Sequence, residues 1–490
     1  MRVLLIQPPF EDFYITSIRT YPLGLLYIAT ALENLGHSVK ILDALNPLQK
    51  KTVKMPKVFN YLKPVYNARE VGPIKLFGEY YRFGLSNQQI LKEIGEYQPE
   101  VVGISSNFTA YFSSVSALAK DIKAKYPHIQ ICIGGYHATV FSELITRDYP
   151  EIDVVISGTA EKELSKFFAS NHNPLQNNAD MIVHHGLLSN KYLMHKQNMI
   201  SLIASRGCPH NCAFCTVKTM HKTYSNRSVA SVIKEMQVEY ELNKVRVFNF
   251  EDDNISCNKA WFAELLQTII NAFEGKSLVL YAMNGIDIKN LEVEILSLMY
   301  RAGFRSLNIS LVTAVDLVKA ELGRPFKNVD FEKTVNEALR LGFAITTYII
   351  IGLPSQTKQS ILEGIEYLSR FDVLIAPSFY YPPPGTNACP EFDLSNPDNW
   401  PFVRSSVFPI EAENLKREDM VYLFSYIRLL NFAKFLQKKY ALPTVTLEIL
   451  NTLSTATMQS ENISRLTEEE IGIAQLKEYL ASNNIVRVYR

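Results

Sequence analysis

The stretch of this chain that decides its fold is Ser205-Arg206-Gly207-Cys208-Pro209-His210-Asn211-Cys212-Ala213-Phe214-Cys215. It holds three of the six cysteines, at C-x-x-x-C-x-x-C spacing. The run before the cysteines, Leu202–Ser205, predicts a β-strand, so the thiols are expected in the loop at that strand's carboxyl end. Crowded cysteines in a chain with too few others for a disulfide scaffold indicate a metal or cluster site.

Two kinds of inorganic site compete for these cysteines. A structural zinc site takes four ligands, usually as two separated pairs, and His210 could complete one. His210 lies inside the loop, however, where the cysteine spacing already constrains the backbone. Three thiolates on a four-iron cluster leave one iron open to a small chelating ligand. The sequence therefore favours a [4Fe-4S] cluster on Cys208, Cys212 and Cys215, with a zinc loop or a chance grouping as the alternatives.

Strand-like and helix-like segments alternate downstream of the cysteines. The six predicted strands are Leu202–Ser205, Val245–Phe250, Leu278–Ala282, Ser306–Leu311, Ala344–Ile351 and Val373–Phe379. Six successive βα units predict a partial (β/α)6 TIM-like barrel over residues 200–395, with its active site at the carboxyl ends of the strands. The alternation then stops, which predicts a small, mostly helical region at 396–490, with helices at 412–440 and 466–482.

The chain upstream of the cysteines predicts a separate α/β unit at 1–168. Its predicted strands are Val3–Ile6, Val39–Leu42, Val101–Ile104, Ile129–Ile133 and Val154–Ile156. Alternation of such strands with amphipathic segments predicts a doubly wound, Rossmann-like parallel sheet. Residues 46–85 are irregular and are expected to be an insertion containing one helix, while 169–199 are expected to be a linker.

The overall composition excludes several classes of protein. With 490 residues, 47% of them hydrophobic, the chain can bury large cores and is expected to form two or three domains. The 50 Lys and Arg against 49 Asp and Glu create no field that would attract nucleic acid. No run approaches the ~18 apolar residues of a membrane span, and the N-terminus lacks the features of a signal peptide. A cytoplasmic protein without a membrane span is expected.

The cysteine triplet behind a first barrel strand resembles the signature of the radical S-adenosylmethionine enzymes. In that family the open iron is chelated by the amino and carboxylate groups of S-adenosylmethionine, whose reductive cleavage yields a 5′-deoxyadenosyl radical. The resemblance implies a [4Fe-4S] cluster and S-adenosylmethionine as cofactors. It also implies that Phe214, directly before the third cysteine, lies near the adenine.

Further motifs at successive strand ends carry the resemblance along the barrel. Glu251, Asp252 and Asp253 stand where the family binds the methionine ammonium, although a solvated turn would have the same composition. Residues 352–357, beginning with Gly352 and Leu353, resemble the G-L-P-G-E-T adenine-contact turn, with Ser-Gln in place of Gly-Glu. The remaining candidates are Ser310 for the ribose or carboxylate, and Tyr380 and Tyr381 as catalytic residues on the substrate side.

Residues 1–168 resemble the cobalamin-binding domain that precedes the barrel in one large class of these enzymes, and the resemblance implies cobalamin as a cofactor. No D-x-H-x-x-G motif is present, so it also implies cobalt without a protein histidine. The paired glycines at 134–135 fit close approach of a macrocycle and fit a tight turn equally. The absence of G-x-G-x-x-G after the first strand disfavours nucleotide binding. The cobalamin-binding candidates are Pro8, Asn107, Phe108, Thr109, Gly134, Gly135, His137, Gly158 and Glu161.

The combined resemblance implies a cobalamin-dependent radical S-adenosylmethionine enzyme. Its expected reaction is methylation of an unactivated carbon of a small-molecule, lipid or peptide substrate, through methylcobalamin and a 5′-deoxyadenosyl radical. An electron donor such as flavodoxin or ferredoxin is the expected protein partner. An oxidative cyclase or ring-rearranging enzyme and a non-catalytic corrinoid-binding protein stay open as alternatives. A methylthiotransferase is disfavoured because only Cys132 precedes the triplet.

Overall fold

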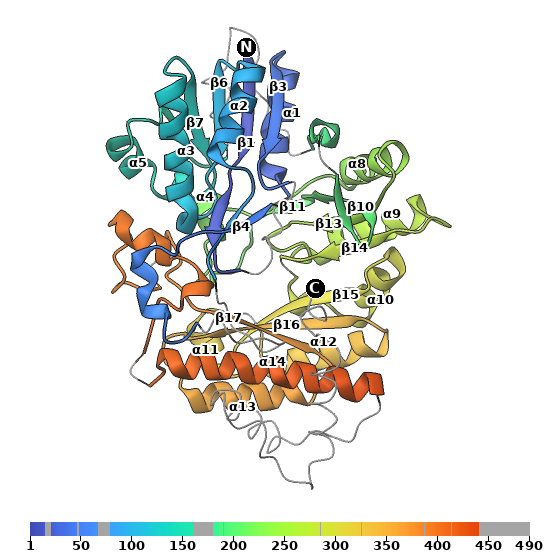
Figure 1. Ribbon diagram of the computed structural model, residues 1–490. Coiled ribbons are helices and arrows are strands. Elements are labelled where there is room, and N and C mark those ends of the chain that lie inside the picture. The colour runs from blue at the N-terminus through green and yellow to red at the C-terminus, as the bar shows by residue number, and fades with distance from the viewer. Residues whose placement is uncertain are drawn as a thin grey trace.

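The chain is described by a computed structural model that covers residues 1–14, 21–46, 49–66, 79–159, 180–189, 191–284, 286–324, 326–386, 388–412 and 414–440. Two α/β units follow one another along the chain (Figure 1). The N-terminal unit, in blue and teal, lies above the second unit, whose strands run from green to orange. The predicted order of a doubly wound sheet followed by a partial barrel is confirmed.

The N-terminal unit is built on a five-stranded parallel sheet with the order β3-β1-β6-β7-β8. The strands are β1 (Arg2–Gln7), β3 (Ser38–Asp43), β6 (Val101–Ser105), β7 (Gln130–Gly134) and β8 (Val154–Ile156). The helices between them are α1 (Leu23–Asn34), α2 (Asn87–Tyr97), α3 (Phe112–Lys125), α4 (Tyr136–Val140) and α5 (Ser142–Asp148). Separate apolar cores lie on the two faces of this sheet, as a doubly wound arrangement requires.

The insertion at 46–85 forms more regular structure than expected. Its strands β4 (Lys50–Thr52) and β5 (Tyr81–Phe83) join β2 (Phe10–Asp12) in an antiparallel sheet with the order β2-β5-β4. A 3-10 helix at Lys57–Leu62 is the one helical segment in its described part. This small sheet holds the chain that leaves β1 towards the second unit.

The second unit contains six parallel strands, as predicted, but they form two sheets. Its strands are β10 (Gln197–Leu202), β13 (Val245–Phe250), β14 (Val279–Ala282), β15 (Ser306–Val312), β16 (Ala344–Ile351) and β17 (Leu374–Phe379). The sheet orders are β14-β13-β10-β9 and β15-β16-β17, and one isolated bridge between Leu280 and Phe304 joins them. The outer helices are α8 (Val229–Leu242), α9 (Lys259–Ala272), α10 (Val293–Ala302), α12 (Asn328–Arg340) and α13 (Lys358–Ser369).

The first barrel strand lies earlier in the chain than expected. Residues 202–205 were predicted to be the strand, whereas β10 ends at Leu202 and pairs with β9 (Tyr192–Met194). The predicted linker at 169–199 therefore ends in β9 and the first residues of β10. Ser205–Arg206 instead forms β11, paired with β12 (Ser225–Asn226), and this pairing closes the base of the cysteine loop.

The C-terminal region covers the free edge of the second sheet. The helix α14 (Arg417–Tyr440) runs along β17 and α13 near the bottom of Figure 1. The Asn431 amide accepts a hydrogen bond from the Ile375 N–H (3.0 Å) and donates one to the Ile375 carbonyl (2.7 Å). These bonds satisfy backbone groups of β17, which lies at the edge of its sheet and pairs only with β16 among the described strands. The second expected helix, at 466–482, lies outside the described residues.

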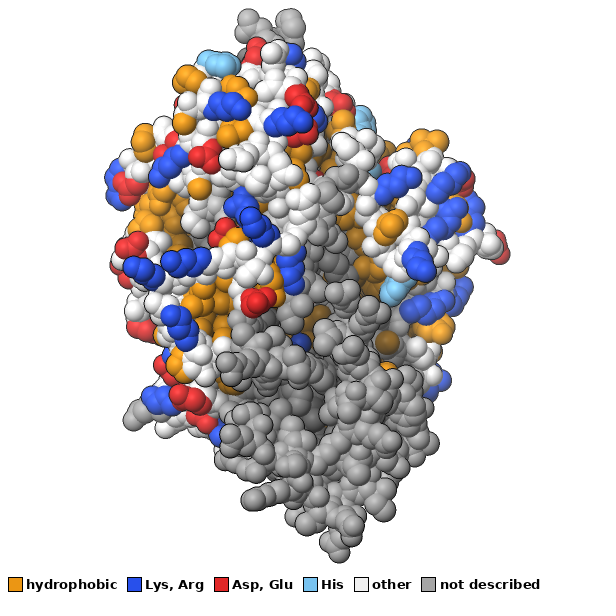
Figure 2. All heavy atoms as spheres, viewed as in Figure 1, with side chains coloured by type: hydrophobic (Ala, Val, Ile, Leu, Met, Phe, Trp, Pro, Cys, Tyr) orange, Lys and Arg blue, Asp and Glu red, His pale blue; other side chains and the backbone are white. Residues whose placement is uncertain are grey.

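The surface of the described chain gives two further observations. None of its helices is long and apolar enough to cross a membrane. Figure 2 shows basic and acidic side chains interspersed over the visible face of the N-terminal unit. This face therefore carries no large patch of one sign.

Candidate active site

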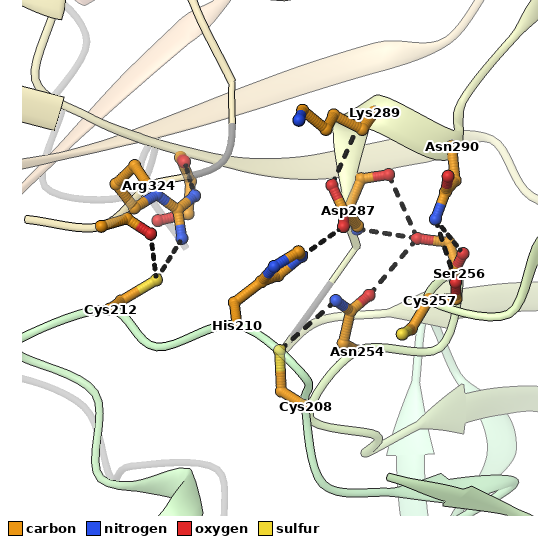
Figure 3. A network of polar contacts seen from close by, with 12 residues as sticks. Cys208, His210, Cys212, Asn254, Ser256, Cys257, Asp287, Lys289, Asn290 and Arg324 are labelled. Atoms are coloured by element: carbon orange, nitrogen blue, oxygen red, sulfur yellow. Dashed lines mark hydrogen bonds and ion pairs between the residues drawn. The ribbon is translucent and has the colours of Figure 1, made fainter. Parts of the chain in front are cut away.

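The cysteine loop brings three thiols to the carboxyl end of β10. Asn254 Nδ2 lies 3.5 Å from the Cys208 sulfur, and Arg324 Nη1 lies 3.7 Å from the Cys212 sulfur (Figure 3). Desolvation raises the pKa of the Cys215 thiol, and the charges of the other two thiols add to that rise. All three thiols are free, and they lie close enough to influence one another's ionisation.

His210 braces this loop and points its ring at a carboxylate. Its Nε2 lies 2.5 Å from Oδ2 of Asp287, a buried residue in the loop after β14 (Figure 3). Gly207 has φ +82°, and a Cβ there would come 2.5 Å from the Thr223 carbonyl oxygen, so the turn into the cysteines requires glycine. Because the His210 ring already bonds to Asp287, the alternative in which His210 is a fourth metal ligand is disfavoured.

Asp252 does not have the role expected from its position among three acidic residues. It is buried and accepts hydrogen bonds from the Ala204 N–H (3.1 Å), the Ser205 N–H and the Ser205 hydroxyl (2.5 Å). Burial raises the pKa of this carboxyl to about 7. Asp252 therefore holds the backbone between β10 and the cysteines, and its assignment to the methionine ammonium is wrong.

The two neighbours of Asp252 are better placed to meet a ligand. Asp253 accepts a hydrogen bond from the Gly207 N–H (2.8 Å) and lines the large cavity described below. Glu251 accepts hydrogen bonds from the Ser201 hydroxyl (3.0 Å) and from the Asn284 amide. Because Asn284 also lines the cavity, these groups form a polar edge that can bind a cation.

A cavity of about 670 Å³ lies between the two units. Its N-terminal wall comes from the loop after β6 and from Tyr136, whose hydroxyl donates to the Pro384 carbonyl of the second unit. Its barrel wall contains many apolar and aromatic groups. The lining residues are Asn107, Phe108, Thr109, Tyr136, Phe214, Thr216, Asp253, Asn284, Ile350, Ser378, Phe379, Tyr380, Tyr381, Pro383, Pro384 and Val403. The cavity thus joins the expected cobalamin edge to the cysteine loop.

The two tyrosines expected on the substrate side differ in their surroundings. The Tyr380 hydroxyl donates to the Ala388 carbonyl (3.0 Å), and burial raises the pKa of Tyr380 to about 12. Tyr381 is 36% exposed and has no hydrogen-bond partner among the described residues. Its hydroxyl is therefore the free one of the two in the cavity.

The turn after β16 is held by a residue that departs from the family pattern. Gln356 Oε1 accepts hydrogen bonds from the Gly352 N–H (2.9 Å) and the Leu353 N–H (3.0 Å), and its Nε2 donates to the Ile350 carbonyl (3.1 Å). Ser355 has φ +68°, a conformation that favours the glycine of the family motif. Leu353 packs with Phe214 and Tyr380 beside the cavity, which suits an apolar contact with adenine.

Ser310 is exposed at the end of β15, and no described side chain bonds to its hydroxyl. Its carbonyl accepts a hydrogen bond from Arg324 Nη2 (2.6 Å). Ser310 lies near the carboxyl end of β15, and its contact with ribose or carboxylate stays a prediction. The sequence analysis did not single out Arg324, which comes from the loop after α11 (Asp316–Glu321). Asn254 was also missed as a site residue, although it directly follows the acidic run. Its position at that strand end was the signal that could have identified it.

His137 is a core residue and cannot reach a bound cofactor. It is fully buried, its Nδ1 bonds to the Thr109 hydroxyl (3.1 Å), and its ring packs against Phe112, Phe141 and Trp400. Burial lowers the pKa of His137 to about 3. Its expected role in cobalamin binding is therefore wrong, and Thr109 has its hydroxyl committed to this core.

The paired glycines serve the packing of the sheet edge. Gly135 has φ +117°, and a Cβ there would come 2.4 Å from Asn107 Oδ1, which accepts a hydrogen bond from the Tyr136 N–H (3.2 Å). Gly134 has ordinary space beside Ile156. Gly158 faces open space with φ +75°, and its N–H donates to the Thr139 hydroxyl (2.9 Å). Glu161 lies outside the described residues.

The spaces at this edge fit a large ligand with a narrow extension. A smaller cavity of about 90 Å³ runs between α1 and the sheet, lined by Gly24, Gly103 and Gly134. It adjoins the large cavity because Asn107 lines both, and Asn107 also lines a crevice beside Pro8. An open edge with side-chain-free positions leading into an apolar slot suits cobalamin, a flat macrocycle with a flexible tail.

The three thiols fit a four-iron cluster. Among the described residues, no group of three His, Cys, Asp or Glu side chains is arranged to hold one metal ion. A cluster takes each thiolate on a different iron, so its ligands stand farther apart than the ligands of a single ion. The hydrogen-bond donors beside the Cys208 and Cys212 sulfurs suit bound thiolates.

Comparisons with known proteins agree with a cluster site at the cysteine loop and a cobalamin site at the edge of the N-terminal sheet. The model of the Radical SAM superfamily matches residues 202–368, and that of the B12 binding domain matches 79–168. The chain is 27% identical to cytidylyl-2-hydroxyethylphosphonate methyltransferase of Streptomyces wedmorensis, over 72% of this chain and 73% of that protein. It is 24% identical to anaerobic magnesium-protoporphyrin IX monomethyl ester cyclase of Synechocystis, over 70% of this chain and 66% of that protein.

A solved structure shares this fold over about three quarters of the chain. The radical S-adenosylmethionine methyltransferase TsrM of Kitasatospora setae, with cobalamin and a [4Fe-4S] cluster bound, superposes with a TM-score of 0.54 at 15% identity, covering 77% of this chain and 72% of that one. At this identity the likeness is one of fold. The two matched domains and the fit of both sites identify the cofactors as a [4Fe-4S] cluster, S-adenosylmethionine and cobalamin. The chain belongs to the cobalamin-dependent radical S-adenosylmethionine enzymes.

Proposed function

We propose that this enzyme methylates an unactivated carbon of a small-molecule, lipid or peptide substrate that binds in the cavity between its two units. The observation that carries the proposal is that one cavity is lined both by the edge of the B12-binding domain and by the cysteine-loop side of the barrel. When bound, the cofactors supply a 5′-deoxyadenosyl radical from one side and a transferable methyl group from the other. A substrate carbon held between them can meet both.

The enzyme's own residues bind, orient and exclude water in this proposal. Asp253 and Asn284, with Glu251 behind them, supply a polar edge for the methionine ammonium. Phe214 lines the cavity and supplies an apolar surface for the adenine, and Leu353 belongs to the buried cluster against which Phe214 packs. The aromatic lining keeps water away from a reactive radical, which is the protein's main task in chemistry of this kind.

Tyr381 is our candidate for contact with the substrate. Its hydroxyl lies in the cavity without a partner among the described residues, whereas the Tyr380 hydroxyl is committed to a backbone carbonyl. Substitution Tyr381→Phe should reduce methyl transfer to substrate while leaving iron and cobalamin content unchanged. The matched control is Tyr380→Phe, which should reduce thermal stability because it removes a buried hydrogen bond.

The names of the relatives favour methylation, and one of them keeps oxidative cyclisation as an alternative. The relative in Streptomyces is named a methyltransferase, and the relative in Synechocystis is named a cyclase. An oxidative cyclisation would use the same cavity and the same radical, but it would not consume a methyl group. The two reactions therefore differ in whether S-adenosylhomocysteine is formed.

Product analysis of the anaerobically reconstituted enzyme decides between them. The enzyme is supplied with reductant, methyl-deuterated S-adenosylmethionine and a metabolite extract. Methylation predicts that S-adenosylhomocysteine accumulates with 5′-deoxyadenosine and that a metabolite gains the deuterated methyl group. Formation of 5′-deoxyadenosine with substrate loss but without S-adenosylhomocysteine would contradict methylation and support cyclisation. Corrinoid binding without either product would support the non-catalytic alternative.

We infer the cellular location of the enzyme and its protein partner from the chemistry of the cluster. Cluster ligands must stay reduced, so a cytoplasmic location and a donor protein such as flavodoxin or ferredoxin are proposed. The mixed charges on the visible N-terminal face give no support for a nucleic-acid partner. We assign cobalamin binding to residues 1–168 and the radical barrel to residues up to 395, which includes β9 and β10. The third region is 396–490, and its described part, up to Tyr440, covers the edge of the second sheet.

A further inference from the structure

Two cysteines of the cluster motif have side-chain hydrogen-bond donors, and the two donors are of different kinds. The donor to Cys208 is the side-chain amide of Asn254, and the donor to Cys212 is the guanidinium of Arg324 (Figure 3). The two side-chain donors come from outside the cysteine loop, so each can be altered without changing the motif.

Asn254 is buried and held in one orientation. Its Oδ1 lies 3.5 Å from the Ser256 hydroxyl, which in turn accepts the Asp287 N–H (2.7 Å) and lies 3.2 Å from the Asp287 carbonyl. With Oδ1 engaged on this side, Nδ2 is left to face the Cys208 sulfur, as Figure 3 shows. The same Asp287 bonds to His210, so the donor and the cysteine loop are anchored on one residue.

Arg324 is brought to the loop by the residue before it. Gly323 has φ +67°, and a Cβ there would come 2.8 Å from the Asn211 carbonyl oxygen, so only glycine lets this turn approach the cysteines so closely. Arg324 Nη2 donates to the Ser310 carbonyl (2.6 Å), which leaves Nη1 directed at Cys212. Its Nε is buried and has no hydrogen-bond partner in the part of the chain that the structure describes.

We propose that Asn254 and Arg324 raise the reduction potential of the [4Fe-4S] cluster by donating hydrogen bonds to the Cys208 and Cys212 thiolates. Reduction adds one electron to the cluster, taken from the external donor protein, and a hydrogen-bond donor stabilises the more negative state. Arg324 has the larger effect, because a charged donor forms a stronger bond than a neutral amide. Both are positioning residues that act through the cysteines.

This inference goes beyond the proposed function, because it concerns the cluster alone and holds for any substrate. The test uses the full-length reconstituted enzyme without S-adenosylmethionine, cobalamin or substrate. A redox titration followed by electron paramagnetic resonance of the reduced cluster gives the midpoint potential. Because no methyl transfer is measured, failure of this test and failure of the methylation proposal are distinguishable.

The variants are Arg324→Met and Asn254→Leu, with Lys289→Met as the matched control. Lys289 belongs to the same network, but only its backbone N–H bonds to Asp287, and its side chain is exposed and bonds to no sulfur. We expect the midpoint potential to fall in both variants, further in Arg324→Met, and to stay at the wild-type value in the control. A wild-type potential in both variants with full iron content would overturn the proposal, as would an equal fall in the control.

Two milder substitutions keep the proposal testable where cluster assembly fails. Arg324→Lys keeps the charge but loses the planar fork, and Asn254→Ser keeps a hydroxyl that is too short to reach the sulfur. Both should bind a full cluster and titrate at a potential below the wild type, with Arg324→Lys nearer to it than Arg324→Met where both assemble. Iron-replete Arg324→Lys and Asn254→Ser that both titrate at the wild-type potential would overturn the assignment.

Discussion

Asp252 illustrates how a single buried carboxylate can organise a catalytic loop. Its oxygens accept two backbone N–H groups and one hydroxyl at the point where β10 leads into the cysteines. Burial raises the pKa of this carboxyl to about 7, above the ordinary value of 3.8. Removing water from a charge is costly, and the three donors offset part of that cost. The loop geometry therefore depends on a group that titrates near neutral pH.

The raised pKa of Asp252 predicts a pH-dependent stability. The folded state holds its proton to a higher pH than the unfolded state, so this stabilisation is complete below pH 3.8 and is lost as pH rises towards about 7. The Asp252→Asn variant lacks this pH-dependent stabilisation. Its thermal unfolding midpoint should therefore fall less than that of the wild type as the pH rises from 3.8 to about 7. An unchanged pH profile in Asp252→Asn would contradict the prediction. Glu251→Gln, at the neighbouring half-exposed position, is the control.

The three motif cysteines should be individually necessary for iron. Substitution of Cys208, Cys212 or Cys215 by Ala should remove the cluster, its absorbance and S-adenosylmethionine cleavage, because each thiolate holds a different iron. Cys132→Ala is the control, since this thiol is buried in the core beneath the N-terminal sheet. It should retain all of the iron. Stoichiometric zinc in anaerobically purified protein, or unchanged iron in the triple variant, would contradict the cluster.

At the scale of elements, the turn after β16 shows why the family motif tolerates change. Gln356 replaces a glutamate, and its amide does two jobs that a carboxylate cannot combine, accepting two N–H groups and donating to the Ile350 carbonyl. Ser355 replaces a glycine and adopts φ +68°. The turn keeps its shape because the glutamine bonds outweigh the strain of one left-handed serine.

Two substitutions in this turn should change stability in opposite directions. Ser355→Gly should raise the free energy of unfolding by up to ~1 kcal/mol, because glycine adopts this conformation without strain. Gln356→Leu should lower it by ~1–3 kcal/mol, because buried N–H groups lose their acceptor. Denaturant unfolding of the two variants measures both. Destabilisation by Ser355→Gly would show that the serine hydroxyl contributes more than its backbone conformation costs.

The positions of helices and strands could be predicted well from the sequence. The roles of single residues could not be predicted where they depend on the direction of a side chain or on contacts with residues distant in the chain. All six barrel strands and all five strands of the first sheet were expected near their observed positions. The three adjacent acids lie just beyond the end of β13 and do not all face one ligand, because Asp252 is the one that turns inward. His137 was misassigned because Trp400, which packs on it, is distant in the sequence.

At the scale of the whole molecule, a buried ion pair fixes how the two units meet. Arg404 Nη1 lies 3.2 Å from Oδ2 of Asp12, and the two side chains are only 6% and 0% exposed. Asp12 also accepts the hydroxyls of Tyr111 (2.5 Å) and Ser406 (2.5 Å), so its charge is fully compensated. A buried pair of this kind contributes specificity of arrangement more than net stability. It holds the chain after β1 against the segment after β17, next to Val403, which lines the shared cavity.

The arrangement of the two units leads to a prediction about the cobalt. The cavity between them has no histidine among its described lining residues, and His137 is buried in the core with its Nδ1 bonded to Thr109. Residues 1–168 should therefore bind cobalamin without a protein nitrogen on the metal. Electron paramagnetic resonance of the cobalt(II) form of the full-length enzyme should show no superhyperfine splitting from a histidine. Such a splitting would contradict the ligation.

A glycine at the sheet edge allows cobalamin binding to be separated from cluster binding. In Gly135→Val the new Cβ meets Asn107 Oδ1 and the backbone must leave φ +117°, so the loop that lines the cavity has to move. We expect this variant to lose bound cobalamin while keeping its iron, because the cysteine loop belongs to the other unit. Gly186→Ala is the matched control, since a Cβ there meets nothing within 4 Å. Cobalt and iron analysis of both variants after reconstitution measures the effect. Full cobalamin content in Gly135→Val would show that this edge is not the cobalamin site, and joint loss of cobalt and iron would show that the two units do not assemble independently.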